Sequence, residues 1–371
     1  MNFPSKIKLS ITPLSQWFPS TDKPLTIFGP CSAESEKQLI DTAKSISKNF
    51  PNNIFRAGIW KPRTRPNSFE GVGSVGLQWL KKVKQETGML VATEVANAHH
   101  IDECLKAGID VLWLGARTTG NPFSVQEIAD ALVGVDIPVF VKNPLNPDLQ
   151  LWLGALERIN DAGITKIGAI HRGFHSTEKT NFRYSPKWEL VIALKTIIPE
   201  LPIVCDPSHI CGNTEMLENI SQKALDLAMD GLMLETHISP KQALSDAHQQ
   251  ITPEKLFEIF SNLTIRKTFS ENVIFKSQLE MLRDLIDRAD EELLQVVSKR
   301  MSIVQKIGEY KKENNVTILQ IKRWEEILRN QLQTGNNLAL SSDFIKHLYL
   351  LIHDESIRLQ TGVMNEKKQE V

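Results

Sequence analysis

The chain has 371 residues, of which 41% are apolar and 23% are charged, with 43 basic and 44 acidic side chains. This composition excludes a disordered chain, which would be too poor in apolar residues to form a core, and a globally basic nucleic-acid-binding protein. At about 150 residues per domain, the length predicts one large domain with a small one.

Targeting signals and cysteine pairs are not evident in the sequence. The first twenty or so residues contain no apolar run long enough for a secretory signal, and no run of about 18 apolar residues predicts a membrane span. The four cysteines form no closely spaced pair, so the sequence predicts neither a disulfide framework nor a zinc finger. We expect a cytoplasmic protein without membrane or nucleic-acid partners.

Short β-branched segments alternate with helical segments between about residues 25 and 236. Eight such segments begin at Leu25, Ile54, Met89, Asp110, Ile137, Thr165, Pro202 and Gly231. Strands that alternate with helices form a parallel sheet, and eight units predict a (β/α)8 TIM barrel. A doubly wound open sheet is the alternative, but GPCSAE after the first strand is not a glycine-rich phosphate loop.

The sequence from about Ser270 onward predicts only helices. Apolar residues recur at three- and four-residue steps over 274–312, and shorter helices are expected over 321–334 and 342–363. Gly335 and Asn336 suit a helix C-cap, and Ser341 and Ser342 suit an N-cap. At about 1.5 Å per residue the first helix is more than 50 Å long. The two shorter helices cannot cover its whole apolar face, so we expect a partner chain to cover the rest. The predicted domains are 1–265 and 274–364, an α/β barrel and an all-α three-helix domain that dimerises.

The residues that follow barrel strands line the rim where barrel enzymes hold their active sites. Strands one, seven and eight are neighbours in a closed barrel, and polar side chains of three kinds follow them: Cys31, Asp206, His209, Glu235 and, further on, Asp246. A thiol, an imidazole and carboxylates together suit a divalent first-row metal ion better than magnesium. His237 is expected only to support such a site from behind.

Cationic side chains follow the other strands. They are Arg56, Lys61, Arg63, Arg117, Lys142 and Arg172, with His171 beside them. Cations gathered in a cleft suit phosphate and carboxylate groups. Glu94 stands alone among them, either as a proton-transfer group or as a structural partner for an arginine. The pattern predicts chemistry between two phosphorylated small molecules, with a metal that polarises a carbonyl.

Several motifs carry a family resemblance across about residues 20–250. GPCSAE, FRAGIWKPRT, TEV, GAR, VKNP, HRG, DPSH and DGLMLETH with ALSD resemble, in this order, the type I 3-deoxy-D-arabino-heptulosonate 7-phosphate (DAHP) synthases. The resemblance implies that phosphoenolpyruvate (PEP) condenses with erythrose 4-phosphate in aromatic amino-acid biosynthesis by the shikimate pathway.

The same resemblance implies roles for individual residues. A divalent metal, first Mn²⁺ with Fe²⁺, Co²⁺ and Zn²⁺ as alternatives, would be held by Cys31, His209, Glu235 and Asp246. PEP would be held by Arg56, Lys61, Arg117, Lys142 and Arg172. Arg63 and Thr64 would face the sugar phosphate, and Lys61 would donate a proton.

A related family leaves an alternative for the barrel. The 3-deoxy-octulosonate 8-phosphate synthases take arabinose 5-phosphate, and they usually have Asn where this chain has Pro62. The proline favours the DAHP family. Arg65 and the segment GARTTGNPF depart from the commonest patterns of that family, which leaves the subgroup open.

The helical tail resembles the all-helical chorismate mutases between Leu279 and Met364. The residues that carry the likeness are Arg283, Arg300, Lys311, Arg323, Ser356 and Gln360. By this resemblance Arg283 and Arg300 bind carboxylates of chorismate, Lys311 and Gln360 its ether oxygen, and Arg323 a further anionic group. Trp324 and Gln320 replace residues common in that family, a change that predicts weaker mutase turnover.

Helix geometry adds a prediction about assembly. Arg300 and Lys311 are eleven residues apart, which is about three turns, so they share one helix face. Arg283 lies seventeen residues from Arg300, about 25 Å away on another face, so it serves the pocket of a partner chain. We therefore expect a homodimer, or a higher homo-oligomer, through the tail.

These observations together predict a bifunctional enzyme, a transferase fused to an isomerase. The mutase pocket is also expected to sense chorismate or prephenate and to control the barrel allosterically. The alternative for the tail is a non-catalytic sensing and dimerisation module.

Overall fold

The computed structural model describes residues 7–18, 24–61, 68–177, 181–267 and 269–365. They belong to two compact units, Met1–Thr268 and Phe269–Val371. The expected domains, 1–265 and 274–364, have limits a few residues away from these. No helix in the described residues is long and apolar enough to cross a membrane.

The first unit is a closed barrel in which each parallel strand pairs with the next and β8 pairs with β1. The strands are β1 (Leu25–Gly29), β2 (Ile54–Arg56), β3 (Leu90–Val95), β4 (Val111–Leu114), β5 (Val139–Lys142), β6 (Ile167–His171), β7 (Ile203–Cys205) and β8 (Gly231–Glu235). All eight predicted strands are present, so the barrel prediction is confirmed and the open sheet is excluded.

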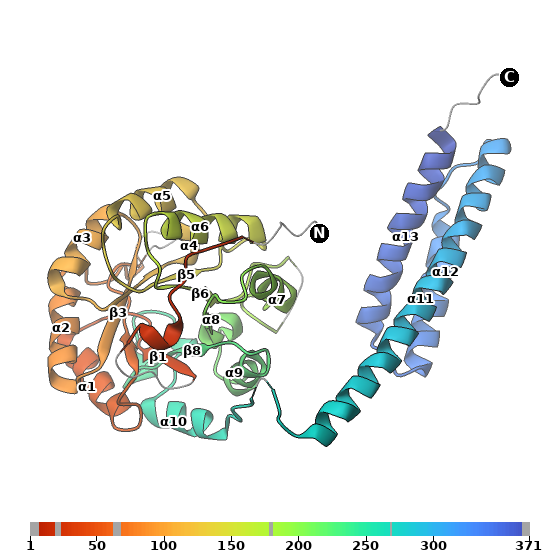
Figure 1. The fold of residues 1–371 in the computed structure, drawn as a ribbon. Helices are drawn as coiled ribbons and strands as arrows, with labels where there is room; N and C mark the ends of the chain where they lie inside the picture. Colours follow the sequence, from red (N-terminus) through yellow and green to blue (C-terminus); the bar gives the residue numbers. More distant parts are fainter. Residues whose placement is uncertain (1–6, 19–23, 62–67, 178–180, 268, 366–371) are drawn as a thin grey trace. The chain divides into compact units, whose positions relative to one another are not determined.

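Helices surround the strands (Figure 1). They are α1 (Glu36–Ser47), α2 (Val75–Thr87), α3 (Ala98–Ala107), α4 (Ala116–Thr119), α5 (Pro122–Ala131), α6 (Leu149–Asp161), α7 (Trp188–Ile197), α8 (Pro207–Cys211), α9 (Leu217–Asp226) and α10 (Pro253–Asn262). Side-chain caps fix where several begin: Ser35 accepts a hydrogen bond from the Gln38 N–H, and Asp148 from the Leu151 N–H.

Two apolar layers hold the barrel together. Side chains that alternate along the strands fill its interior, among them Ile27, Trp113 and Phe140. Trp17, from the segment before β1, joins this interior cluster and packs 5.3 Å from the Phe140 ring, centroid to centroid. The opposite strand faces pack against the helices in a larger cluster. A filled interior leaves the rim as the place for polar chemistry.

The second unit consists of α11 (Val273–Glu313), α12 (Ile321–Asn337) and α13 (Ser342–Asn365). The three predicted helices are present. The prediction that Gly335 ends α12 is wrong, because the helix continues to Asn337. A Cβ on Gly335 would lie 2.5 Å from Ile345 Cγ1, so this glycine serves close packing of α12 against α13.

The first half of α11 is largely exposed within the second unit. Its buried residues, Val304 and Gly308, both lie in the second half. Apolar side chains along the first half are exposed, including Leu282, Leu285, Ile286 and Leu293. A helix with such an apolar stripe is stable in water when another surface covers the stripe.

Candidate active sites

The carboxyl end of β1 brings the backbone of Cys31 against Arg56 at the end of β2. A Cβ on Gly29, two residues before the cysteine, would lie 2.1 Å from the Arg56 carbonyl oxygen, so only glycine permits this approach. Arg56 Nη2 then donates to the Cys31 carbonyl oxygen at 3.1 Å. The thiol is fully buried. The position of Cys31 at the rim is therefore fixed from both strands.

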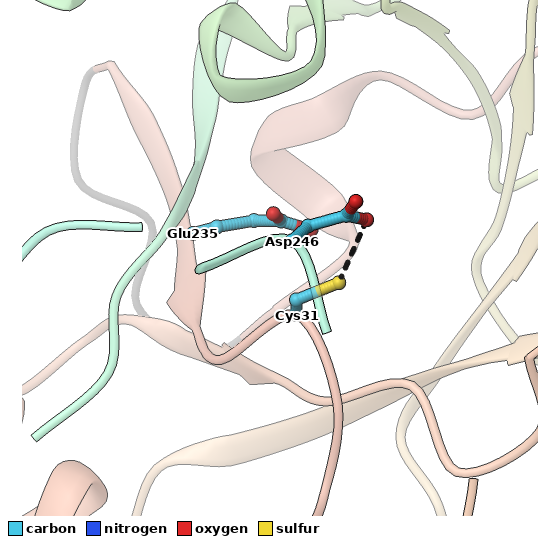
Figure 2. A group of neighbouring side chains, drawn as sticks. All are labelled: Cys31, Glu235 and Asp246. Atoms are coloured by element: carbon cyan, nitrogen blue, oxygen red, sulfur yellow. Dashed lines mark hydrogen bonds between the residues drawn. The ribbon is translucent and has the colours of Figure 1, made fainter. Parts of the chain in front are cut away.

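Three of the four expected metal ligands lie together at this rim. One donor atom each of Cys31, Glu235 and Asp246 lies within 4.8 Å of the other two. Figure 2 shows the Cys31 thiol and the Asp246 carboxylate facing each other, with Sγ 3.4 Å from Oδ2. Glu235 ends β8 and Asp246 lies in the loop after it, so the group joins distant parts of the sequence through closure of the barrel.

The fourth expected ligand, His209, lies beside this group on the short helix α8. Its Nδ1 is 2.8 Å from Asp206 Oδ2, and its Nε2 is 3.8 Å from Glu235 Oε1. A carboxylate behind one ring nitrogen orients the other nitrogen toward a metal in many metalloproteins. Asp206 was noticed in the sequence as part of DPSH but was not predicted as a site residue; its pairing with histidine is what only the structure reveals.

The thiol and carboxylates of this group would be stabilised more by a divalent cation than by one another. Burial, followed by the charge of Glu235, raises the pKa of the Cys31 thiol to about 12. Glu235 Oε1 is buried and accepts no hydrogen bond from the described residues. A cation at this point would reverse the effect on the thiol, because a coordinated sulfur is a thiolate. The site therefore has the donor composition of a metal site.

Cations approach the same group from the barrel side. Lys61 Nζ lies 3.0 Å from Cys31 Sγ, and Arg56 Nη2 lies 3.3 Å from Glu235 Oε1. Burial opposes the charge of Lys61, but Cys31 and Glu235 outweigh burial and raise the pKa of its ammonium group. Two Arg56 nitrogens, Nε and Nη1, are buried without a hydrogen-bond partner among the described residues. Such donors suit an anionic ligand.

The remaining predicted anion-binding residues lie on other strands of the barrel. Lys142 Nζ, at the end of β5, donates to Asp206 Oδ2 at 2.9 Å. Arg172, after β6, is buried and keeps Nη1 without a partner among the described residues. Arg117 lies in α4 and is exposed. Arg63 and Thr64 lie outside the described residues.

Glu94 has a structural partner, although not an arginine. Its Oε2 accepts a hydrogen bond from Trp113 Nε1 at 3.0 Å. The same tryptophan ring lies 5.0 Å from the Arg56 guanidinium and 5.8 Å from Lys142 Nζ. Trp113 thus contacts two of the predicted anion-binding cations, a role that the sequence analysis missed because its spacing is that of a core residue.

Glutamine side chains that the sequence analysis also missed support the candidate ligands. Gln249 Nε2 donates to Glu235 Oε2 at 2.7 Å, and Gln250 Oε1 accepts from the Cys31 N–H at 2.9 Å. Both glutamines are buried. Neither residue type signals a metal site by itself, so nothing in the sequence could have identified them.

The helical unit contains a cavity of about 570 Å³ between its three helices. Five residues predicted for the mutase site line it: Arg300, Lys311, Arg323, Ser356 and Gln360. Arg300 Nη1 donates to Ser356 Oγ at 2.8 Å, and Lys311 Nζ donates to the Ile318 carbonyl oxygen at 2.6 Å. Burial lowers the pKa of Lys311. The cavity therefore gathers cations from α11 and α12 opposite polar side chains of α13.

Trp324 and Arg283, two further residues from the sequence analysis, differ in their position relative to this cavity. Trp324 also lines the cavity and stacks on His353, with ring centroids 4.0 Å apart. Arg283 does not line this cavity; it pairs with Glu280 at 2.6 Å on the exposed half of α11. The structure thus brings together every predicted mutase residue except Arg283.

Comparisons with known proteins agree with both units. Residues 10–268 match the model of the DAHP synthetase I family, and residues 282–361 match chorismate mutase type II. A phospho-2-dehydro-3-deoxyheptonate aldolase of Thermotoga maritima is 32% identical over 240 residues, covering 64% of this chain and 67% of that protein. A 2-dehydro-3-deoxyphosphooctonate aldolase of Helicobacter pylori is 27% identical over 271 residues, covering 66% and 95%.

Solved structures show the same likeness. A crystal structure of the Thermotoga maritima DAHP synthase matches with a TM-score of 0.57 and 30% sequence identity, covering 64% of this chain and 67% of that one. A truncated form of the enzyme from the same organism matches with a TM-score of 0.55 at 27% identity, covering 64% and 84%. The DAHP synthase family is generally metal-dependent, in agreement with the donor group at the rim. The chain therefore belongs to the DAHP synthetase I family and carries a chorismate mutase type II domain after its barrel.

Proposed function

We propose that the barrel condenses PEP with erythrose 4-phosphate to DAHP and phosphate, with Mn²⁺ as the metal. The observation that carries this proposal is the group of Cys31, Glu235 and Asp246, with Lys61 Nζ 3.0 Å from the thiol. Cys31, His209, Glu235 and Asp246 would hold the ion, which when bound supplies Lewis acidity to a substrate carbonyl.

The residues of the chain account for the rest of the reaction. Arg56, Lys142, Arg172 and Arg117 bind the carboxylate and phosphate of PEP, and Arg63 and Thr64 face the sugar phosphate. C3 of PEP then attacks the aldehyde carbon, water adds at C2, and phosphate leaves. Lys61, which its neighbours keep protonated, is placed to donate a proton to the aldehyde oxygen.

Experiment must identify the sugar substrate, because one relative is named as a heptonate aldolase and another as an octonate aldolase. We expect product from erythrose 4-phosphate and little from arabinose 5-phosphate, and no product from either after treatment with a chelator. Product from arabinose 5-phosphate alone would assign the barrel to the octulosonate synthases. Chelator-resistant turnover would contradict the metal site.

We propose that the helical unit converts chorismate to prephenate. This rearrangement needs no nucleophile, so catalysis consists of holding chorismate compact and stabilising charge on its ether oxygen. Arg300 and Arg283 would bind carboxylates, Lys311 with Gln360 the ether oxygen, and Arg323 a further anionic group. The gathering of these residues, except Arg283, around one cavity supports the assignment. A cavity of about 570 Å³ is large enough for a ligand of this size.

We also propose that the unit forms a homodimer in which Arg283 reaches the partner's cavity. The exposed apolar half of α11 and the distance of Arg283 from its own cavity support this assembly. Prephenate or chorismate bound there would then control the synthase. The rival is a non-catalytic sensing module, and absence of chorismate turnover in the parent protein would favour it. Synthase kinetics unchanged by prephenate would contradict feedback.

A further inference from the structure

Arg183 and Tyr184 lie between the candidate metal group and the candidate PEP cations. They belong to the loop between β6 and α7, in a part beyond the HRG motif that neither the motifs nor the proposed mechanism uses. Arg183 Nη1 donates to Asp246 Oδ1 at 3.1 Å and to Gln249 Oε1 at 2.7 Å. The Tyr184 ring lies under Arg172, with its centroid 3.5 Å from Arg172 Cζ. Two consecutive side chains therefore contact the two halves of the site.

The backbone of this segment is held on two sides. The Tyr184 N–H donates to the Ile210 carbonyl oxygen at 3.2 Å and the Arg183 N–H to that of Cys211 at 3.3 Å, both on α8. On the other side, the Phe174 N–H donates to the Ser185 carbonyl oxygen at 2.8 Å. A Cβ on Gly173, at φ +78°, would lie 2.8 Å from the Tyr184 carbonyl oxygen, so glycine permits the approach. The tyrosine is thus fixed beside Arg172.

The stack compensates for the burial of Arg172. Arg172 is 4% exposed, and burial lowers the pKa of its guanidinium group. An aromatic face is attractive to a desolvated guanidinium and also fixes its plane. A fixed plane matters because arginine binds carboxylate and phosphate through two parallel N–H groups. Arg172 Nη1, which has no partner among the described residues, remains available for such a ligand.

We propose that Arg183 and Tyr184 are positioning residues: Tyr184 orients Arg172 for PEP, and Arg183 orients Asp246 for the metal. This inference rests on the proposed roles of Arg172 and Asp246. It predicts different main defects for the two residues, because the hydrogen bonds of Arg183 reach Asp246 and Gln249, whereas the Tyr184 ring stacks on Arg172. Tyr184 affects the dependence on PEP, and Arg183 affects the dependence on the metal.

The test for Tyr184 compares Tyr184→Leu, Tyr184→Phe and the control Phe123→Leu, which removes an exposed aromatic ring on α5. We expect Tyr184→Leu to raise KM for PEP about tenfold, or about 1.4 kcal/mol, with KM for erythrose 4-phosphate nearly unchanged. Tyr184→Phe keeps the ring but removes the hydroxyl, which also hydrogen-bonds to Arg172, so its effect on KM for PEP should be smaller than that of Tyr184→Leu. Calorimetric titration of the Mn²⁺-loaded enzyme with PEP should show the same weakening without turnover.

The test for Arg183 uses Arg183→Met and measures free Mn²⁺ by its electron paramagnetic resonance signal, without substrates. We expect about tenfold weaker Mn²⁺ binding, because removing a residue that orients a ligand usually costs about 10–100-fold in affinity. Tyr184→Leu should bind Mn²⁺ as the parent does. An unchanged KM for PEP in Tyr184→Leu would overturn the role of Tyr184, and parental Mn²⁺ affinity in Arg183→Met that of Arg183.

The outcome for the parent protein separates this inference from the proposed function. A parent that makes no DAHP but binds PEP and Mn²⁺ refutes the function alone, and the binding measurements still test both positioning roles. Equal rises in both KM values in Tyr184→Leu would indicate general damage to the barrel and would also overturn the inference.

Discussion

The barrel and the helical unit build their sites in opposite ways. In the barrel, the polar site groups Arg56, Lys142, Asp206 and Glu235 are almost completely buried, and hydrogen bonds and ion pairs satisfy much of their polarity. In the helical unit, the cavity lies between only three helices, and large apolar side chains of α11 stay exposed. The barrel completes its site by closing on itself, whereas the helical unit leaves an apolar surface of α11 exposed.

The largest effect is expected from a substitution that disables the barrel site and leaves the helical site intact. Cys31→Ser should lower the condensation rate by about 1,000-fold at limiting Mn²⁺, because Lewis-acid catalysis is worth several kcal/mol. Weaker Mn²⁺ binding in a direct titration should accompany the loss. Chorismate turnover by the same variant is the matched control and should not change. Undiminished condensation would show that the thiol is not a ligand.

A second substitution should disable the helical site and leave the barrel site intact. Arg300 lines the cavity and donates to Ser356. Arg300→Ala should reduce chorismate turnover by about 100-fold, the usual loss when one donor to developing charge is removed. The condensation rate measured in the presence of Mn²⁺ should stay at the parental value. A parental mutase rate in this variant would exclude Arg300 from the site.

A third variant tests whether the helical unit is incomplete as a single chain. Leu282→Glu with Ile286→Glu places two carboxylates on the exposed apolar face of α11. We expect a shift toward monomer in sedimentation velocity and at least about a tenfold loss of mutase turnover, because buried unpaired carboxylates are costly at an interface. Arg288→Glu with Glu291→Arg, which exchanges the charges of two exposed residues on the same half of α11, is the control. A fully active monomer would contradict the intertwined dimer.

The last prediction concerns the acid stability of the barrel rather than its activity. Burial, helped by Arg172, lowers the pKa of His171 to about 3. Because the unfolded histidine has a pKa of about 6.5, the fold loses stability as the pH falls from about 6.5 toward 3, by about 2 kcal/mol at pH 5. His171→Gln should flatten this dependence.

Urea unfolding followed by tryptophan fluorescence at pH 7 and pH 5 measures this effect. Six of the seven tryptophans lie before residue 269, so the signal reports mainly the barrel. If the parent and His171→Gln lose equal stability between these pH values, His171 is not the group responsible.

The sequence by itself determined the alternation of strands and helices, the three helices of the tail and the residue types at the strand ends. Local pattern suffices for these features, because hydrophobic periodicity and helix caps act over a few residues. The motifs around Cys31, His209 and Glu235 could also be read from the chain. Gly335 was misread because a glycine near a helix end and a glycine at a helix contact look alike in sequence.

Only the tertiary structure decided which side chains meet. Asp206 behind His209, the two glutamines behind Glu235 and Cys31, and the contacts of Arg183 and Tyr184 all join residues distant in the chain or ordinary in type. Closure of the barrel brings Asp246 to Cys31, because strand β8 must pair with β1 before these two residues can approach each other. Such proximity depends on long-range packing, which no local pattern encodes.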